Sequence, residues 1–207
     1  MTRLISLSRA GLFLFCTLAL LSASAVADDL IVGVGAWGDW GTYVIDPNTG
    51  VTTQKTYETG WAMGASSSPY PQSIFVLGTI ALGRFDMNSR QWQGLGYLPF
   101  TSWDLAFDRN AGVLYGVGYD GGVVSIDYGS CSMSCTETFV GSFQGDVRAI
   151  DFVRGFGIFG ADINGSLWLF DPANGNVTNV GETGILGISD LAYDVAGKKL
   201  MASAGSP

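Results

Sequence analysis

A unit of about 43 residues recurs along this chain, and it constrains the fold more than any other feature. Three short segments align without gaps, and their last aspartates are 43 residues apart: Asp104–Asp108, Val147–Asp151 and Asp190–Asp194. Six residues after each of these aspartates a second apolar run begins. Chance rarely keeps two registers at once, so the chain is built from internal repeats.

Two further runs complete the unit. A third run ends in aspartate in four repeats, at Asp46, Asp86, Asp127 and Asp171, and a fourth, more polar run follows after turn residues. Short β-branched and aromatic runs bounded by turn residues predict strands, and no segment after the first 27 residues has helical periodicity. We expect the four aspartates to cap their own turns rather than to bind cations.

Four antiparallel strands in about 43 residues is the period of a β-propeller blade. We therefore predict an all-β propeller of four-stranded antiparallel blades, with about four blades present. They are expected at roughly residues 30–60, 61–100, 103–143 and 146–184, with a partial blade at 188–207. The last repeat stops after two strands, which would leave an unpaired edge, so we expect an incomplete, truncated propeller. A closed ring of four blades and a β-sandwich are the alternatives.

The repeat unit resembles the blades of extracytoplasmic NHL, YVTN and PQQ-like propellers. The likeness lies in an alanine-containing strand closed by aspartate, then a glycine-rich strand, then a strand that again ends in aspartate before a turn. It covers nearly all of residues 30–207. It implies an architecture and hardly any function, because one fold hosts many functions.

The first 27 residues predict a cleaved signal peptide. Arg3 and Arg9 accompany an apolar core at Ala10–Leu21, and Ala25–Ala27 has the small side chains of a cleavage site. An uncleaved membrane anchor is the alternative. We expect a periplasmic or secreted protein that is not inserted in a membrane after cleavage.

Charge and residue usage exclude several classes of function. The chain has a net charge of −8, and removal of Arg3 and Arg9 with the signal peptide makes it −10, which argues against nucleic acid. Cys131 and Cys135 should form a disulfide that acts as a local staple. Two thiols in a chain without histidine are half a metal site, so we predict no metal and no cofactor. A serine triad is excluded as well, whereas catalysis by paired carboxylates stays possible.

The chain also contains the glycine pattern of a nucleotide-binding motif. Gly33–Gly38 matches G-x-G-x-x-G, and so does Gly116–Gly121 at the same place in its own repeat. The motif needs a helix next, but a strand follows each of these segments. We expect both to be hairpin turns between the second and third strands of a blade.

The candidate binding site is the mouth of the central channel, where the loops entering the innermost strands should converge. These loops carry Trp61, Trp103, Asp104, Asp146, Arg148 and Asp190. Aromatic rings beside carboxylates at one rim would suit an unknown protein, peptide or carbohydrate ligand. The alternative is that Trp61 and Trp103 pack between adjacent blades.

The sequence therefore predicts an exported binding or interaction module without an assigned catalytic residue. The alternative is the N-terminal part of a propeller enzyme, a lactonase, lyase or quinoprotein-like dehydrogenase, whose catalytic residues would lie beyond Pro207.

Overall fold

The computed structural model describes residues 31–35, 41–45, 51–56, 62–89, 91–100 and 102–204, with side chains at 51, at 63–89 and in the last two ranges. The regular secondary structure of these residues is β throughout. No helix long and apolar enough to cross a membrane occurs in the ranges described. The predicted signal peptide at 1–27 and Trp61 lie outside the described residues.

The strands form five antiparallel sheets, each a meander of consecutive strands. Sheets of four strands make blades 2, 3 and 4, a three-stranded sheet makes blade 1 and a two-stranded sheet makes blade 5. Blade 1 contains β1 (Ile31–Gly35), β2 (Gly41–Ile45) and β3 (Thr52–Thr56). Blade 2 contains β4 (Ala62–Ser67), β5 (Ser73–Gly78), β6 (Ala81–Asp86) and β7 (Gln91–Tyr97). Blade 3 contains β8 (Ser102–Asp108), β9 (Val113–Gly118), β10 (Gly122–Asp127) and β11 (Thr136–Ser142). Blade 4 contains β12 (Val147–Val153), β13 (Gly157–Asp162), β14 (Ser166–Asp171) and β15 (Asn176–Glu182), and blade 5 contains β16 (Ile188–Asp194) and β17 (Lys199–Ala204).

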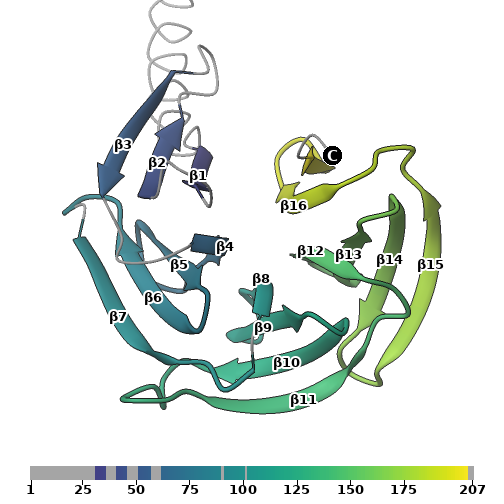
Figure 1. The fold of residues 1–207 in the computed structure, drawn as a ribbon, viewed down its shortest axis with the longest axis horizontal. Helices are drawn as coiled ribbons and strands as arrows, with labels where there is room; N and C mark the ends of the chain where they lie inside the picture. Colours follow the sequence, from purple (N-terminus) through teal and green to yellow (C-terminus); the bar gives the residue numbers. More distant parts are fainter. Residues whose placement is uncertain are drawn as a thin grey trace, which may run out of the picture.

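The blades are arranged as an open arc around a centre (Figure 1). The inner strands β4, β8, β12 and β16 face the centre, and β7, β11 and β15 lie at the periphery (Figure 1). Neighbouring inner strands contact one another in this order. The predicted all-β architecture of four-stranded blades in an incomplete propeller is thus confirmed for the described residues.

The core lies between the faces of adjacent blades. One buried cluster joins Phe75 and Leu82 of blade 2 to Leu105 of blade 3, and a second joins Val117 of blade 3 to Ile158 of blade 4. Fully burying such a side chain contributes roughly 1.5–3 kcal/mol. Each blade is therefore stabilised mainly by its neighbours, as expected of a repeat architecture.

The aspartates that end the third strands cap their own turns. Asp86 Oδ1 accepts hydrogen bonds from the backbone N–H groups of Asn88 and Ser89. Asp127 and Asp171 make the same kind of contact two residues ahead. The predicted capping role is confirmed at these three positions, and Asp46 lies outside the described residues. Gly116–Gly121 likewise comprises the end of β9 and the hairpin turn before β10, as expected, and Gly121 in the turn has a φ of +74°.

A disulfide joins Cys131 to Cys135, as predicted, with an S–S distance of 2.08 Å. Its loop reaches beyond its own blade. The N–H of Tyr97 at the end of β7 donates to the carbonyl of Met133 at 3.0 Å, and the N–H of Cys135 donates to the carbonyl of Tyr97 at 2.8 Å. The disulfide closes a short local loop, and hydrogen bonds of that loop also join blade 3 to the edge of blade 2.

The gap-free alignment of the repeats is wrong by two residues at β12. The ladders of β8, β12 and β16 resume after a bulge at Asp104, Ala149 and Asp190, so these three residues are equivalent. Their spacings are 45 and 41 rather than 43 and 43, and Val147 is not the counterpart of Asp104. A shift of two residues keeps every side chain on the same face of a strand, so the apolar pattern fits both alignments.

Candidate functional site

Each inner strand is interrupted by a bulge near its first residue, at the end of the channel that we call the upper mouth. The bulged residues are Met63, Trp103, Arg148 and Ser189. A bulge re-aims a side chain without changing the ladder beyond it. Four equivalent positions therefore carry four chemically different side chains around one mouth.

Two of these residues, Trp103 and Arg148, contact each other across the boundary between blades 3 and 4. The guanidinium carbon of Arg148 lies 4.7 Å from the centre of the Trp103 ring, within the range of a cation–π interaction. Arg148 also donates from Nη2 and Nε to the two carboxylate oxygens of Asp146, at 2.8 and 3.1 Å. Tyr119, at the tip of the β9–β10 hairpin, places its ring centre 4.1 Å from that of Trp103. We call Trp103, Tyr119, Asp146 and Arg148 the upper-mouth platform.

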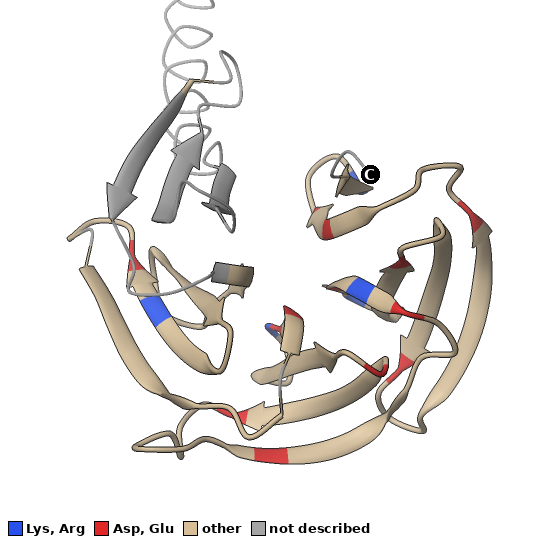
Figure 2. Cartoon of the chain, in the orientation of Figure 1, with Lys and Arg blue, Asp and Glu red and all other residues tan. Residues whose placement is uncertain are grey.

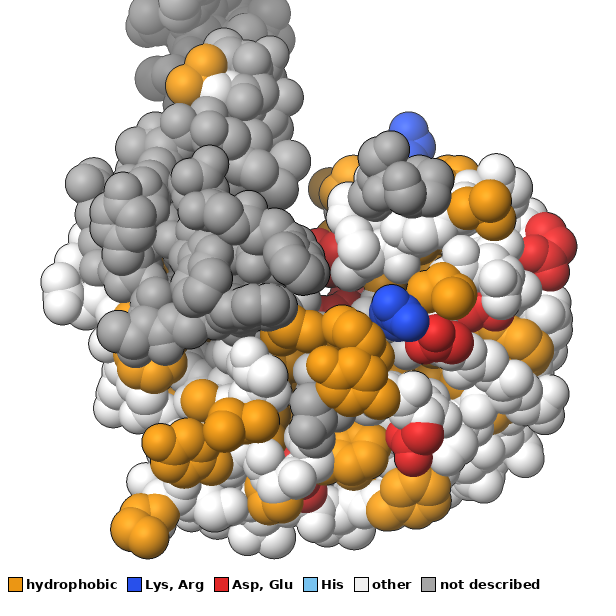
Figure 3. All heavy atoms as spheres, viewed as in Figure 1, with side chains coloured by type: hydrophobic (Ala, Val, Ile, Leu, Met, Phe, Trp, Pro, Cys, Tyr) orange, Lys and Arg blue, Asp and Glu red, His pale blue; other side chains and the backbone are white. Residues whose placement is uncertain are grey.

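The platform has a buried side and an exposed side. Trp103 is half-buried and packs against the cluster that joins blades 3 and 4, as in the packing alternative considered for it. Tyr119 is 51% exposed, and the Arg148 and Asp146 side chains are 39% and 36% exposed. Figure 3 shows blue, red and orange side chains gathered beside the centre of this face. Trp103 therefore supports the platform from beneath, whereas Tyr119, Arg148 and Asp146 are partly exposed to solvent.

Asp104 lies inside the molecule, between β8 and β12, rather than on the rim. Its Oδ1 accepts a hydrogen bond from the N–H of Leu105 and its Oδ2 accepts one from the N–H of Ile150, both at 2.8 Å. Burial, and after it the nearby charge of Asp190, raise the pKa of Asp104 well above its usual value. A carboxyl group enclosed in this way links two blades, and its contact with a ligand remains a prediction.

Asp151 makes the same link one blade further on. Its Oδ1 accepts from the N–H of Phe152 at 2.8 Å, and its Oδ2 accepts from the N–H of Tyr193 at 2.6 Å in β16. Burial raises the pKa of Asp151 to about 6. The sequence analysis used Asp151 only to align the repeats, because nothing in the sequence distinguishes a bridging carboxyl group from a capping one.

Asp190 begins the ladder of β16 after its bulge, at the position equivalent to Asp104. The protein atoms around it raise the pKa of Asp190 to about 6, yet the residue as a whole is exposed to solvent. Water that reaches the exposed residue opposes the loss of solvation that raises this pKa. Of the predicted residues, the structure thus brings together Trp103, Asp146 and Arg148, buries Asp104 and leaves Asp190 open.

The lower mouth, where the inner strands end, contains a cavity of about 640 Å³. The ends of all four inner strands and the turns after β8, β12 and β16 line it, and Arg109, Arg154 and Lys198 are among the lining residues. The sequence analysis missed these cations. The gap-free alignment set Arg109 opposite Phe152, whereas the observed spacing of 45 sets it opposite Arg154. An alignment that allowed a shift of two residues would have revealed the repeated arginine.

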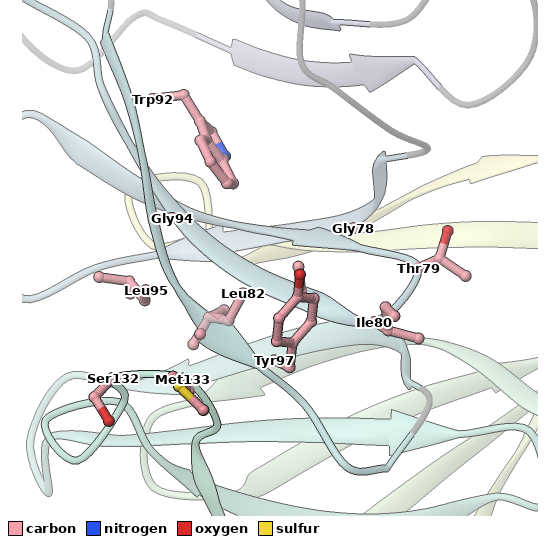
Figure 4. Close-up of a pocket in the computed structure, with 12 residues that line it drawn as sticks. Gly78, Thr79, Ile80, Leu82, Trp92, Gly94, Leu95, Tyr97, Ser132 and Met133 are labelled. Carbon is pink, nitrogen blue, oxygen red and sulfur yellow. The ribbon is translucent and has the colours of Figure 1, made fainter.

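A second cavity, of about 510 Å³, lies away from the channel on blade 2 and beside the disulfide loop. Figure 4 shows Tyr97 between Ile80 and Leu82 in this cavity, with Met133 below. Tyr97 and Met133 are 60% and 80% exposed. The lining offers few polar side chains, so it lacks the groups that orient a polar ligand.

Metal binding finds no support in the geometry of the residues described. Within them, no three side chains of the Cys, Asp and Glu types come together as a set that could hold a metal ion. The charged segments of Figure 2 are instead distributed over several blades.

No family model and no curated protein matches the sequence. The structure is similar to solved β-propeller chains. One belongs to a nidogen/laminin complex, with a TM-score of 0.64 and 9% identity over 84% of this chain and 69% of that chain. An auxiliary nutrient binding protein from Bacteroides thetaiotaomicron gives a TM-score of 0.59 and 13% identity over 84% of this chain and 53% of that one. A protein of unknown function from the same organism gives a TM-score of 0.53 and 13% identity over 83% of this chain and 52% of that chain. This chain spans about half the length of the two bacterial proteins, and identities this low establish the fold alone.

Proposed function

We propose that this protein is an exported binding module whose upper-mouth platform recognises a polyhydroxylated ligand, a saccharide. The observation that carries the proposal is the contact of Arg148 with both Trp103 and Asp146, beside the exposed ring of Tyr119. It holds an aromatic face next to an ordered donor and acceptor pair.

The chemistry of the platform suits a sugar ring better than a simple ion. The C–H face of a sugar can rest on an aromatic ring, while its hydroxyl groups exchange hydrogen bonds with a carboxylate and a guanidinium. The charges of Arg148 and Asp146 largely cancel, so the platform favours neither cations nor anions strongly. A few polar groups placed beside apolar surface are typical of small-molecule sites.

Export is part of the proposal. It rests on the predicted signal peptide at 1–27 and on the Cys131–Cys135 disulfide, which persists in oxidising compartments. The similarity to a nutrient binding protein supports a binding role, although the residues of a site cannot be transferred at 13% identity. A carbohydrate ligand also agrees with the strongly acidic composition, which disfavours phosphate polymers.

The test is a saccharide panel followed by titration calorimetry on the exported protein. Tyr119→Ala and Arg148→Ala should each weaken binding of the best saccharide about 10-fold, because the first removes an aromatic contact and the second a charge-assisted hydrogen bond, each worth roughly 1–2 kcal/mol. Their melting temperatures should change little, since exposed groups contribute little to stability. Tyr97→Ala is the matched control, because Tyr97 is also more than half exposed but lies on the outer strand β7.

Trp103→Ala separates the two roles of the indole ring. We expect it to lower both stability and affinity, because the ring packs in the core cluster and also supports Arg148. A panel without a single binding saccharide, or variants of Tyr119 and Arg148 that bind as tightly as the unmodified protein, would contradict the proposal.

A further inference from the structure

We infer that the lower mouth is a second binding site, for a small organic anion that carries two or three separated carboxylate or phosphate groups. The cavity of about 640 Å³ is within the size of small-molecule sites, roughly 300–1,000 Å³. It is bounded by the ends of β4, β8, β12 and β16, so the rigid inner strands of four blades shape it.

Three cations from three consecutive blades line this cavity. Arg109 follows β8, Arg154 follows β12 at the equivalent position, and Lys198 lies in the turn before β17. The chain has only 10 Lys and Arg against 18 Asp and Glu, so a group of three cations at one mouth is more basic than the composition of the chain as a whole. Within the described part of the chain, none of the three has a carboxylate within 4.0 Å, since the ion pair found there is Arg148–Asp146. Their charges are therefore left for a ligand to neutralise.

The acidic residues nearby are already engaged with the backbone. Asp108 accepts hydrogen bonds from the N–H groups of Asn110 and Ala111, and Asp194 accepts one from that of Ala196. Neither of the two lines the cavity. Asp151 does line it, but both of its oxygens accept backbone N–H groups. The potential inside the cavity is thus set by the three cations more than by the negative charge of the whole protein.

The form of the ligand follows from the placement of the charges. A guanidinium group pairs bidentately with a carboxylate or a phosphate, and the ammonium group of a lysine acts as a point charge. Because the cations belong to different blades, a ligand with separated anionic groups can contact more of them than one compact ion can. Ser66, Ser67 and Asn110 add hydrogen-bonding groups, and Phe152 and Tyr193 add partly exposed rings.

The backbone of Lys198 is in a conformation that side chains rarely adopt. Lys198 has a φ of +52°, in the left-handed region that glycine adopts most easily. In blade 3 the equivalent position is Gly112, with a φ of +69°, because Asp108 pairs with Val113 as Asp194 pairs with Lys199. In blade 2 the equivalent position is Gln72, with a φ of +53°, so this turn also accepts residues other than glycine, and what Lys198 adds at the cavity is its charge.

The experiment is calorimetric titration of the exported protein with citrate and, separately, with inorganic pyrophosphate at low ionic strength. We expect at least one of the two to bind, and added salt to weaken it. Arg109→Ala and Arg154→Ala should each lower the affinity about 10-fold, as expected of a lost charge-assisted hydrogen bond. Lys198→Gly should also lower it, while the melting temperature stays the same or rises, because the substitution removes the charge and eases the backbone.

Lys199→Ala is the matched control. It removes the same charge one residue away, but Lys199 does not line the cavity, so the affinity should not change. Preference for citrate would assign a carboxylate ligand and preference for pyrophosphate a phosphate ligand. Failure of both anions to bind at millimolar concentration, or an equal loss in Lys198→Gly and Lys199→Ala, would overturn the inference. Tyr119→Ala should leave anion binding unchanged, so the outcome is independent of the upper mouth.

Discussion

The backbone N–H of Ile150 in blade 4 donates a hydrogen bond of 2.8 Å to the buried carboxylate of Asp104 in blade 3. Asp151 and Tyr193 repeat this relationship between blades 4 and 5, at 2.6 Å. In both cases the second carboxylate oxygen accepts the N–H of the next residue in its own strand. Adjacent inner strands are therefore joined by side chain–backbone bonds, in addition to the apolar contacts between blades.

Replacement of Asp104 should destabilise the protein strongly. Asp104→Ala leaves the buried N–H groups of Leu105 and Ile150 without their acceptor, at about 1–3 kcal/mol each. We expect the free energy of unfolding, measured by urea denaturation, to fall by about 2–5 kcal/mol. Asp108→Ala is the control, since it removes the same charge from the same strand but only an exposed turn cap. Equal losses in the two variants would show that the bridge between blades contributes nothing special.

Gly64 should tolerate no side chain. A Cβ at this position would lie 2.8 Å from the Cα of Asp104 and 3.1 Å from the carbonyl oxygen of Trp103, both of which belong to the backbone of the next inner strand. Gly64→Ala should lower the melting temperature, with a loss of about 1–3 kcal/mol from the forced separation of two strands. Gly94→Ala should cost less, because the nearest atoms to the added Cβ belong to the partly exposed ring of Trp92, at 3.0 Å, and not to the backbone of another strand. If Gly64→Ala melts like the unmodified protein, the strands are less tightly apposed than described.

Asp151 should make the protein less stable as the pH rises. Its pKa is about 6 in the folded state and 3.8 without the protein environment, so the folded protein retains a proton that the unfolded chain has released. The associated stability is complete below about pH 4 and is lost as the pH rises through about 6. Relative to Asp151→Asn, the unmodified protein should lose at most about 3 kcal/mol across this window, measured by urea denaturation at successive pH values. The pKa of Asp104 is raised in both proteins, so its contribution to the pH dependence largely cancels when the two are compared. The prediction is contradicted if the difference in unfolding free energy between the two proteins does not change with pH, or if the unmodified protein becomes relatively more stable as the pH rises.

Loss of the disulfide should loosen the contact between blades 2 and 3. The double variant Cys131→Ser, Cys135→Ser should lose about 2 kcal/mol, as expected for a short closed loop. The amide of Tyr97, which donates to Met133, should exchange its hydrogen faster, whereas the amide of Ile158 in blade 4 should not. Unchanged exchange at Tyr97 would mean that the loop keeps its place on β7 without the covalent bond.

The sequence predicted the strands and most turns because those depend on local chemistry. Asp86, Asp127 and Asp171 cap turns through contacts within four residues, so their role can be inferred from their position after an apolar run. The register of β12 could not be inferred in the same way. Val147 and Ala149 are both small and buried, and a shift of two residues leaves the alternation unchanged.

The sequence predicted only those site residues that lie where an inner strand begins. The proximity of Trp103, Asp146 and Arg148 follows from their place in loops that converge on one mouth. The burial of Asp104 does not, because an aspartate is rarely buried and its bridge depends on the backbone of a strand 46 residues away. Arg109 and Arg154 escaped notice because their equivalence depends on the same hidden shift of two residues.

The bulges at the upper mouth have a consequence for how such a protein can change. Met63, Trp103, Arg148 and Ser189 stand outside the ladder, so no paired backbone hydrogen bond depends on which side chain each carries. A thioether, an indole, a guanidinium and a hydroxyl already occupy the four positions of one framework. Randomising the codons of Arg148 and Ser189 would thus diversify the rim without breaking the ladder, whereas Met63 and Trp103 also pack against buried clusters, so the choice of side chain there is limited by the core.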